Sequence, residues 1–205
     1  MKKRMQFDEK SHQYSSAEGK KYISVTKAID LAGLMSDWAR DEAAAERGTA
    51  VHLATRLYDE KNFSLLKIHL RETVEMETEG YLEAHILFLK QSRFKVELIE
   101  HRVVDELYGY AGTLDRKGIL NGQKAIGDLK SSKTGRTPLS TAWQTAAYAN
   151  AYKRGGRFLR FGLALHPDGT YNVTLYPPKD MRSDLEDFLA VLRVTRLRKK
   201  LGITK

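Results

Sequence analysis

The stretch that decides the fold runs from Tyr110 to Ser132 and reads YAGTLDRKGILNGQKAIGDLKSS. It contains two strand-like runs joined by Asn121 and Gly122, a dipeptide that strongly favours a type I′ turn between antiparallel strands. Counting back from that turn places Asp115 opposite Asp128 on the neighbouring strand. The sequence therefore predicts a β-hairpin that carries two carboxylates side by side.

A lysine accompanies this pair of acids. Side chains alternate along a strand, so Lys130 projects from the same face as Asp128 while Leu129 points into the core. Like charges on opposed residues are destabilising unless something bridges them, and a divalent cation is such a bridge. Hard cations such as Mg²⁺ bind carboxylates and keep water, which a nearby lysine can orient or deprotonate. A simpler interpretation stays open at this point: two separately solvated aspartates and an ordinary ion pair.

The composition limits the classes of protein to which the chain can belong. With 205 residues, 41% of them hydrophobic, and no shift in composition, we expect one domain over residues 1–205. The absence of cysteine excludes disulfides and cysteine-ligated metal clusters and fits a reducing compartment. No apolar run is long enough to span a bilayer, so we expect no membrane association. The net charge of +9 suits a polyanionic partner such as nucleic acid.

The beginning of the chain predicts a small β-hairpin followed by helices. Residues 6–25 hold two short alternating runs around a turn rich in Ser, Glu and Gly, which is typical of a hairpin. Ser24 or Thr26 can then cap a helix that we expect to end at Leu34.

Two further helices are predicted before the central strands. Ser36 can cap the first, which is rich in Ala, Glu and Arg and which we expect to be interrupted near Gly48, because glycine weakens a helix. Helical periodicity returns at residues 72–90.

The second half of the chain supplies the sheet. In order, we expect three strands, a helix, a hairpin and a final amphipathic helix, at residues 94–106, 108–120, 123–132, 138–154, 158–176 and 181–201. This pattern of elements predicts an α/β (α+β) fold with a central mixed sheet flanked by helices. Gly112 and Gly127 in the central strands are expected to let another backbone or a ligand come close.

Three segments of this half form a set of motifs: GYAGTLDR at 109–116, IGDLKSSK at 126–133 and WQTAAYANAY at 143–152. Together they resemble the PD-(D/E)XK nuclease superfamily, in particular its RecB-type branch of phage and mitochondrial genome maintenance exonucleases. The resemblance implies a restriction-endonuclease-like core in which Asp115, Asp128 and Lys130 form a metal-dependent phosphodiesterase site. Leu114 stands where the family name has Pro, and the lack of cysteines excludes the iron–sulfur subgroup.

The same resemblance implies roles for further residues. Gln144 and Tyr148 match a Gln-x-x-x-Tyr element, and four residues on a helix place them on one face. His52, in RGTAVHLA, matches a histidine metal ligand, and the backbone carbonyl of Leu129 is expected to join Asp115 and Asp128 in holding the ion. Glu100 matches an acid often seen on the preceding strand, although a solvated strand residue is an equal alternative.

Two basic residues follow the lysine strand. Lys133 and Arg136 are expected to contact phosphates of the nucleic acid, although basic loops are often only solvated surface.

The function predicted from these residues is a Mg²⁺- or Mn²⁺-dependent deoxyribonuclease. We expect an exonuclease acting on DNA ends in recombination, repair or replication, in a bacterial or phage-infected cytoplasm, with a recombination or single-strand-binding protein as a further partner. Two alternatives remain: a structure-selective endonuclease or resolvase on the same core, and a catalytically silent DNA-binding accessory module. The sequence leaves polarity, strand preference and oligomeric state open.

Overall fold

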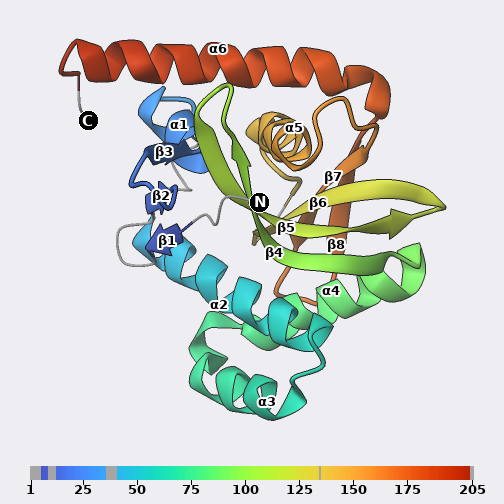
Figure 1. Cartoon of the computed structure of the whole chain (residues 1–205). Coiled ribbons are helices and arrows are strands. Elements are labelled where there is room, and N and C mark those ends of the chain that lie inside the picture. The colour runs from blue at the N-terminus through green and yellow to red at the C-terminus, as the bar shows by residue number, and fades with distance from the viewer. Residues whose placement is uncertain (1–5, 9–12, 36–40, 134, 204–205) are drawn as a thin grey trace.

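The computed structural model describes residues 6–8, 13–35, 41–133 and 135–203 (Figure 1). The strands are β1 (Gln6–Asp8), β2 (Gln13–Ser15), β3 (Lys21–Ser24), β4 (Lys95–Asp105), β5 (Tyr110–Leu120), β6 (Gln123–Ser131), β7 (Leu159–Leu165) and β8 (Tyr171–Tyr176). The helices are α1 (Val25–Leu31), α2 (Glu42–Asp59), α3 (Phe63–Glu72), α4 (Thr78–Ser92), α5 (Ser140–Tyr152) and α6 (Met181–Lys200). Short 3₁₀ turns, η2 (Val74–Met76) and η3 (Pro178–Asp180), precede α4 and α6.

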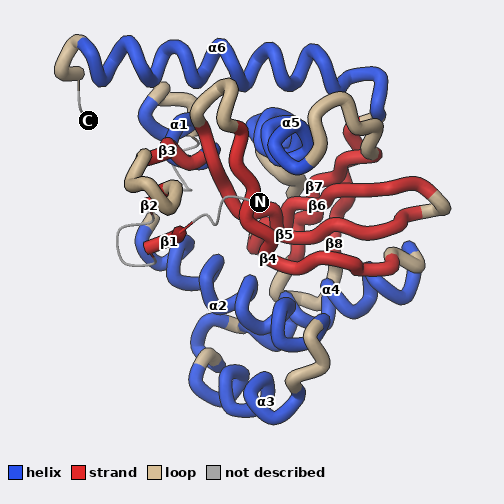
Figure 2. Tube along the Cα trace, viewed as in Figure 1, coloured by secondary structure: helices blue, strands red, loops and turns tan. Residues whose placement is uncertain are grey.

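The strands form one mixed sheet with helices on both faces. Its order is β1-β2-β3-β5-β6-β7-β8, and β4 pairs with β5 off this path. The β3–β5 and β6–β7 pairs are parallel, whereas the other pairs are antiparallel. Figure 2 shows the sheet between two groups of helices. The predicted fold class, a mixed α/β architecture, is therefore confirmed.

Each face of the sheet has its own hydrophobic core. On one face α5 lies against the strands with α1 and α6 packed around it, and Ile29, Leu114 and Phe188 fill the space between them (Figure 1). On the other face α2 and α4 cover the sheet, with Phe88 and Phe161 in the core and α3 outside α2. Among the described residues, no helix is both long and apolar enough to cross a membrane.

The β5–β6 hairpin has the predicted turn and the predicted register. Asn121 and Gly122 both have positive φ, 50° and 77°, as a type I′ turn requires. The ladder runs from the turn as far as Arg116 opposite Gly127. It ends one pair before Asp115 and Asp128, because β6 then leaves β5 and continues beside β7.

This departure opens one edge of β5. The strand pairs with β4 along nearly all of one edge. On the other edge, β3 pairs only at Tyr110 and Ala111, and β6 pairs only from Arg116 onward. Residues 112–115 therefore have no strand partner on that edge within the described part of the chain. The sheet is split at this point, and the split creates room for a site.

The helices differ from the prediction in three places. Ser24 does cap α1, through its Oγ and the Lys27 N–H, but the helix ends at Leu31 because Gly33 turns the chain at φ 83°. α3 was not predicted, and α4 begins later than the expected start of its helix at residue 72. The predicted cap Ser36 lies outside the described residues.

The predicted interruption of α2 near Gly48 is wrong. The helix is continuous, because this segment packs on β6 and α4, and tertiary packing outweighs the low helix propensity of one glycine. A Cβ at Gly48 would lie 3.8 Å from Ser131 Oγ, an ordinary contact.

Gly48→Ala is therefore expected to raise the free energy of unfolding by about 0.5–1 kcal/mol, the helical advantage of alanine over glycine. Urea denaturation measures the change. Gly80→Ala in α4 is the matched control, because its Cβ would lie 1.8 Å from the Pro167 carbonyl oxygen and must destabilise the fold. Equal losses of stability in both variants would contradict this account of Gly48.

Gly127 has a different role from the one expected. A Cβ at this position would lie 2.1 Å from Cζ of Phe161. The glycine therefore makes room for an aromatic side chain of the neighbouring strand rather than for a ligand or a second backbone.

Candidate active site

A cavity of about 290 Å³ lies at the split between β3 and β6. Six residues that the sequence singled out line it: His52, Asp115, Asp128, Lys130, Gln144 and Tyr148. They come from α2, β5, β6 and α5, so the fold gathers residues that are far apart in the chain. The roles that the resemblance implies for them remain predictions.

One group of possible metal ligands consists of His52, Glu100 and Asp115, whose ligand atoms all lie within 4.8 Å of one another. His52 Nδ1 is 3.4 Å from Glu100 Oε1 and 3.9 Å from Asp115 Oδ1. His52 Nε2 is 3.1 Å from the carbonyl oxygen of Leu129, the backbone ligand expected from the sequence. Glu100, for which the sequence left two alternatives open, thus lies in the same cluster as His52.

Asp128 and Lys130 form the other half of the site. Asp128 is 2% exposed, and its Oδ2 lies 2.7 Å from Lys130 Nζ in an ion pair. Leu129 between them is 1% exposed and points into the core, as the alternation of side chains predicts. Its backbone N–H donates a 2.7 Å hydrogen bond to Asp115 Oδ2, which ties the two acidic strands together beyond the end of their ladder.

The ionisable groups of the cavity perturb one another strongly. Burial raises the pKa of Asp115 to about 7; His52 opposes this shift, and Asp128 and Glu100 add to it. Burial by itself lowers the pKa of His52, but Asp115 and Glu100 outweigh it and raise that pKa to about 9. Burial also opposes the charge of Lys130, yet Asp128 and Asp115 raise its pKa above the ordinary value. Without a bound ion, His52 and Lys130 therefore supply the positive charge that the acids require.

The donor set fits a divalent cation. Carboxylates, a backbone carbonyl and an imidazole nitrogen are oxygen and nitrogen ligands that Mg²⁺ or Mn²⁺ accepts. Within the described part of the chain, Asp128 Oδ2 is buried and accepts no hydrogen bond apart from its ion pair with Lys130, so it keeps a lone pair for an ion. These residues could hold a divalent metal.

A buried polar network that the sequence analysis missed supports the cluster. Arg116, 1% exposed, donates from Nε to Asp59 Oδ2 at 2.6 Å and from a terminal nitrogen to Glu100 Oε1 at 3.3 Å. The same nitrogen donates to the Asp115 carbonyl oxygen at 2.8 Å. Asp59 in turn accepts from His85 Nε2 at 3.0 Å. The signal in the sequence was an arginine in the middle of a strand that was expected to be central in the sheet.

Glu100 has an unusual backbone conformation. Its φ of 47° lies in the left-handed region, which is costly for a residue other than glycine and persists only when its surroundings hold it. His52 and Arg116 are the groups that hold the Glu100 carboxylate. The strain is therefore located at the cluster of candidate ligands.

Gln144 and Tyr148 lie on the face of α5 that borders the cavity, as their spacing predicted. Gln144 Nε2 donates to Thr26 Oγ1 at 3.3 Å. Burial raises the pKa of Tyr148 well above its ordinary value, and the nearby aspartates raise it further, so its hydroxyl stays protonated. The ring of Tyr148 fits beside Gly112, where a Cβ would lie 2.5 Å from Tyr148 Cε1. Gly112 thus admits an aromatic ring, and it also lines the cavity in which a ligand would bind.

Gly112→Ala is expected to displace the Tyr148 ring. If the cavity carries out the DNA hydrolysis predicted from the sequence, the rate should fall by about tenfold or more, because small displacements of positioning groups are costly in catalysis. Initial rates on labelled DNA measure the effect. Tyr148→Phe is the companion variant, since it keeps the ring and removes only the hydroxyl. A fully active Gly112→Ala protein would contradict the placement of Tyr148 in the site.

The predicted phosphate contacts Lys133 and Arg136 lie outside the cavity. Both are exposed in the loop between β6 and α5 and do not line it. Their role in binding phosphates remains a prediction. Thr26, expected only as a helix cap, does line the cavity.

Solved structures resemble this chain over most of its length. A candidate exonuclease from Eubacterium rectale superimposes with a TM-score of 0.55 and 17% identity, covering 98% of this chain and 89% of that one. The chain shares its fold. An alkaline exonuclease from Laribacter hongkongensis, also solved in complex with dAMP, gives TM-scores of 0.42 and 0.43 at 14% identity over 88% of this chain and 93% of that one. No protein-family model matches the chain, and no curated protein does.

Proposed function

We propose that this chain is a divalent-metal-dependent nuclease that hydrolyses phosphodiester bonds of DNA. The observation that carries the proposal is the cavity at the split of the sheet, where buried acids, a histidine and a lysine meet. Buried ionisable groups that line a cavity and shift one another's pKa values are typical of functional sites. The fold shared with a candidate exonuclease supports the same proposal.

In this proposal the ion is held by His52, Asp115, Asp128, Glu100 and the Leu129 carbonyl. When bound, a divalent metal lowers the pKa of a water ligand and polarises a phosphate oxygen. The two strands that carry Asp115 and Asp128 are fixed to each other by the Leu129 N–H, so the ligands are held in place before substrate binds.

Lys130 and the two α5 residues act on the substrate. The Lys130 ammonium, held by Asp128, stabilises the negative charge that grows on the phosphate oxygens in the transition state. The amide of Gln144 and the protonated hydroxyl of Tyr148 are neutral donors that orient the strand in the cavity.

We further propose that the enzyme belongs to the RecB-type branch, uses Mg²⁺ or Mn²⁺, and removes nucleotides from DNA ends during recombination, repair or replication. The motifs at residues 109–116, 126–133 and 143–152 support this finer assignment. Cleavage of circular single-stranded DNA distinguishes the endonuclease alternative from an exonuclease.

The test is a time course on end-labelled linear DNA, single- and double-stranded, with Mg²⁺, Mn²⁺ or a chelator. We expect hydrolysis with a metal and none with the chelator. Circular single-stranded DNA in a parallel reaction should persist, whereas its cleavage would show an endonuclease. An absence of hydrolysis with either metal, or hydrolysis unaffected by the chelator, would contradict the proposed function.

A further inference from the structure

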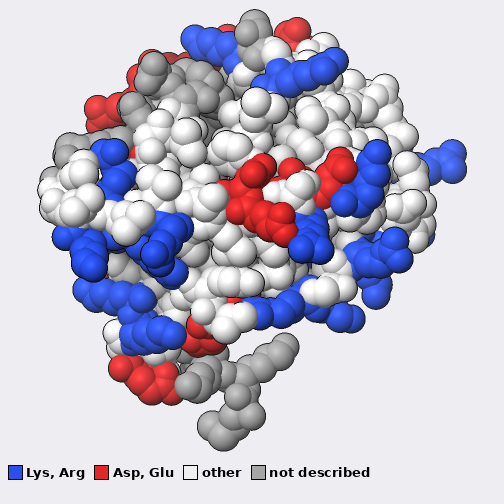
Figure 3. Space-filling view, turned by 90° about the horizontal axis from the view of Figure 1, so that it is seen from above, with Lys and Arg blue, Asp and Glu red and all other residues white. Residues whose placement is uncertain are grey.

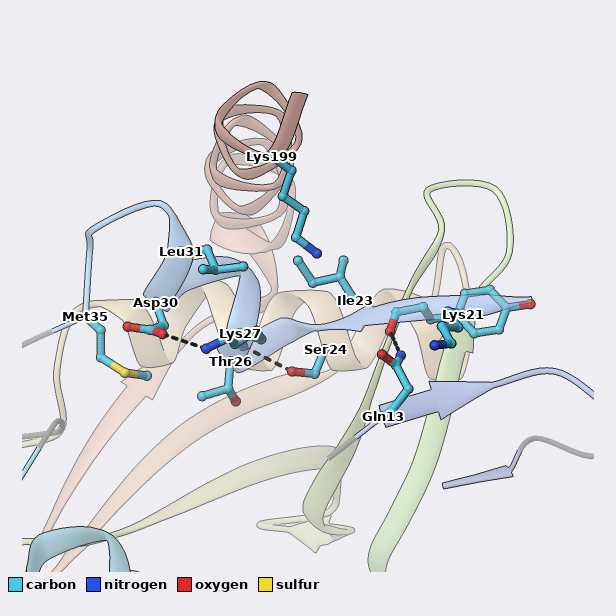
Figure 4. Close-up of a pocket in the computed structure, with 11 residues that line it drawn as sticks. Gln13, Lys21, Ile23, Ser24, Thr26, Lys27, Asp30, Leu31, Met35 and Lys199 are labelled. Atoms are coloured by element: carbon cyan, nitrogen blue, oxygen red, sulfur yellow. Dashed lines mark hydrogen bonds and ion pairs between the residues drawn. The ribbon is translucent and has the colours of Figure 1, made fainter. Parts of the chain in front are cut away.

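A second and larger cavity adjoins the candidate active site. It has a volume of about 790 Å³ and lies where β3 runs into α1, beneath the C-terminal end of α6 (Figure 4). Ser24 and Thr26 line both this cavity and the catalytic one. The two cavities therefore adjoin and share these residues in their walls. We call the larger one the lysine cavity.

Three lysines from three different elements line the lysine cavity: Lys21 of β3, Lys27 of α1 and Lys199 of α6. Lys27 forms an ion pair with Asp30 at 3.2 Å. Neither Lys21 nor Lys199 has an acidic partner among the described residues. Figure 4 shows the Lys199 side chain reaching down from α6 toward β3. The cavity therefore carries more positive than negative charge, and two of its ammonium groups are available to an anion.

One polar group beside these lysines is a donor suited to phosphate. Ser24 Oγ accepts the Lys27 N–H, which leaves its own O–H to donate. Thr26 Oγ1 accepts from Gln144 and also forms a hydrogen bond with the Tyr148 hydroxyl. Through Thr26, the lysine cavity is connected to the α5 residue that we place against the substrate.

The surface around the cavity has the same sign of charge. In Figure 3, Lys and Arg side chains gather at the left of the face, where the C-terminal part of α6 lies. The last turn of α6 carries Arg198, Lys199 and Lys200. A chain with a net charge of +9 thus concentrates part of that charge beside its candidate active site.

We propose that the lysine cavity binds the phosphodiester backbone of the nucleic-acid strand on one side of the catalytic cavity, and that Lys199 makes the end of α6 part of the substrate path. This inference rests on the proposed function. The lysines lie in a cavity that adjoins the catalytic one, so the ligand is an extended polyanion. Single strands of nucleic acid bind in positively charged grooves that follow their phosphates. Lys21 and Lys199 contact phosphates, and the Ser24 hydroxyl donates a hydrogen bond where the two cavities meet.

The test compares two double variants that lose the same charge. Lys21→Gln/Lys199→Gln removes the two unpaired lysines of the cavity, while Lys67→Gln/Lys153→Gln removes two exposed lysines elsewhere. Affinity for a fluorescent single-stranded oligonucleotide is measured by anisotropy with chelator present, over a range of salt concentrations. All four positions are exposed, so circular dichroism is expected to show unchanged folding.

We expect the cavity variant to bind at least about tenfold more weakly than the parent, with a salt slope reduced by about 1.4, since each phosphate contact on a single strand contributes about 0.7. The control variant should change affinity by less than about twofold. Equal affinities and slopes for the two double variants, or a parent protein that does not bind the oligonucleotide, would overturn the inference.

The same assay separates this inference from the proposed function. Binding is measured without metal, so it does not depend on hydrolysis. A parent protein that hydrolyses DNA while the two double variants bind it equally would refute the lysine cavity and leave the nuclease intact. A parent protein that binds the oligonucleotide through Lys21 and Lys199 but does not hydrolyse DNA would refute the nuclease and leave the lysine cavity intact.

Discussion

Asp128→Asn is expected to lower the rate of metal-dependent DNA hydrolysis by about a thousandfold or more, which corresponds to about 4 kcal/mol of transition-state stabilisation. The substitution keeps the size of the side chain but removes a charged candidate ligand whose Oδ2 is buried and faces Lys130. It also leaves the ammonium of Lys130 without its acid. Initial rates on labelled linear DNA at saturating metal measure the loss.

Stability should change much less than the rate in this variant. Asp128 contributes to raising the pKa of Asp115, which means that the two carboxylates repel each other in the metal-free protein. Removing one charge relieves this repulsion but also breaks the ion pair with Lys130, so the two effects on the free energy of unfolding oppose each other. Asp187→Asn, on the exposed face of α6, is the matched control. An Asp128→Asn protein within about tenfold of the parent rate would refute the assignment.

Arg116→Met is expected to reduce the free energy of unfolding by about 3–5 kcal/mol, the cost of leaving a buried charge unpaired. The side chains of Arg116 and Asp59 are 1% and 2% exposed, and the Nε to Oδ2 distance is 2.6 Å. His85 alone then remains to hold Asp59. Urea denaturation of the purified protein measures the change.

A double-mutant cycle separates the pair from its surroundings. Arg116→Met/Asp59→Leu removes both charges, so it should recover part of the stability lost in the single variant. The single variant Asp59→Leu completes the cycle, and the coupling between the two residues is the change in the double variant minus the sum of the two single changes. A loss below about 1 kcal/mol in Arg116→Met, or no recovery in the double variant, would show that this ion pair does not support the site.

The hairpin could be predicted from sequence because its signals are local. Asn121 and Gly122 specify a turn with two positive φ angles between two strand-like runs. The alternation of Asp128, Leu129 and Lys130 follows from the same strand geometry. Residues that a motif ties to one helix face, such as Gln144 and Tyr148, were placed correctly for a similar reason.

The supporting network could not be predicted because it joins segments that the fold brings together. Arg116 meets Asp59 across 57 positions, and Asp59 meets His85 across 26, and no spacing rule links them. The residue at which the β5–β6 ladder ends could not be predicted either, because it depends on the parallel pairing of β6 with β7.

The missed helix α3 has a different cause. Leu66 is its only buried residue, whereas Phe63, Leu65 and Ile68 are more than half exposed. Its apolar residues nevertheless recur at helical spacing, as Phe63, Leu66 and Leu70 do, so the sequence carried a helical signal that the prediction missed.

The most direct test of the central claim is an anomalous difference map from crystals grown or soaked with Mn²⁺. The account predicts a peak in the cavity at the split of the sheet, bound by carboxylate oxygens of Asp115 and Asp128, with the Leu129 carbonyl or His52 beside it. A map without a peak in that cavity, from crystals in which the site is accessible to solvent, would contradict the metal centre on which the proposed nuclease depends.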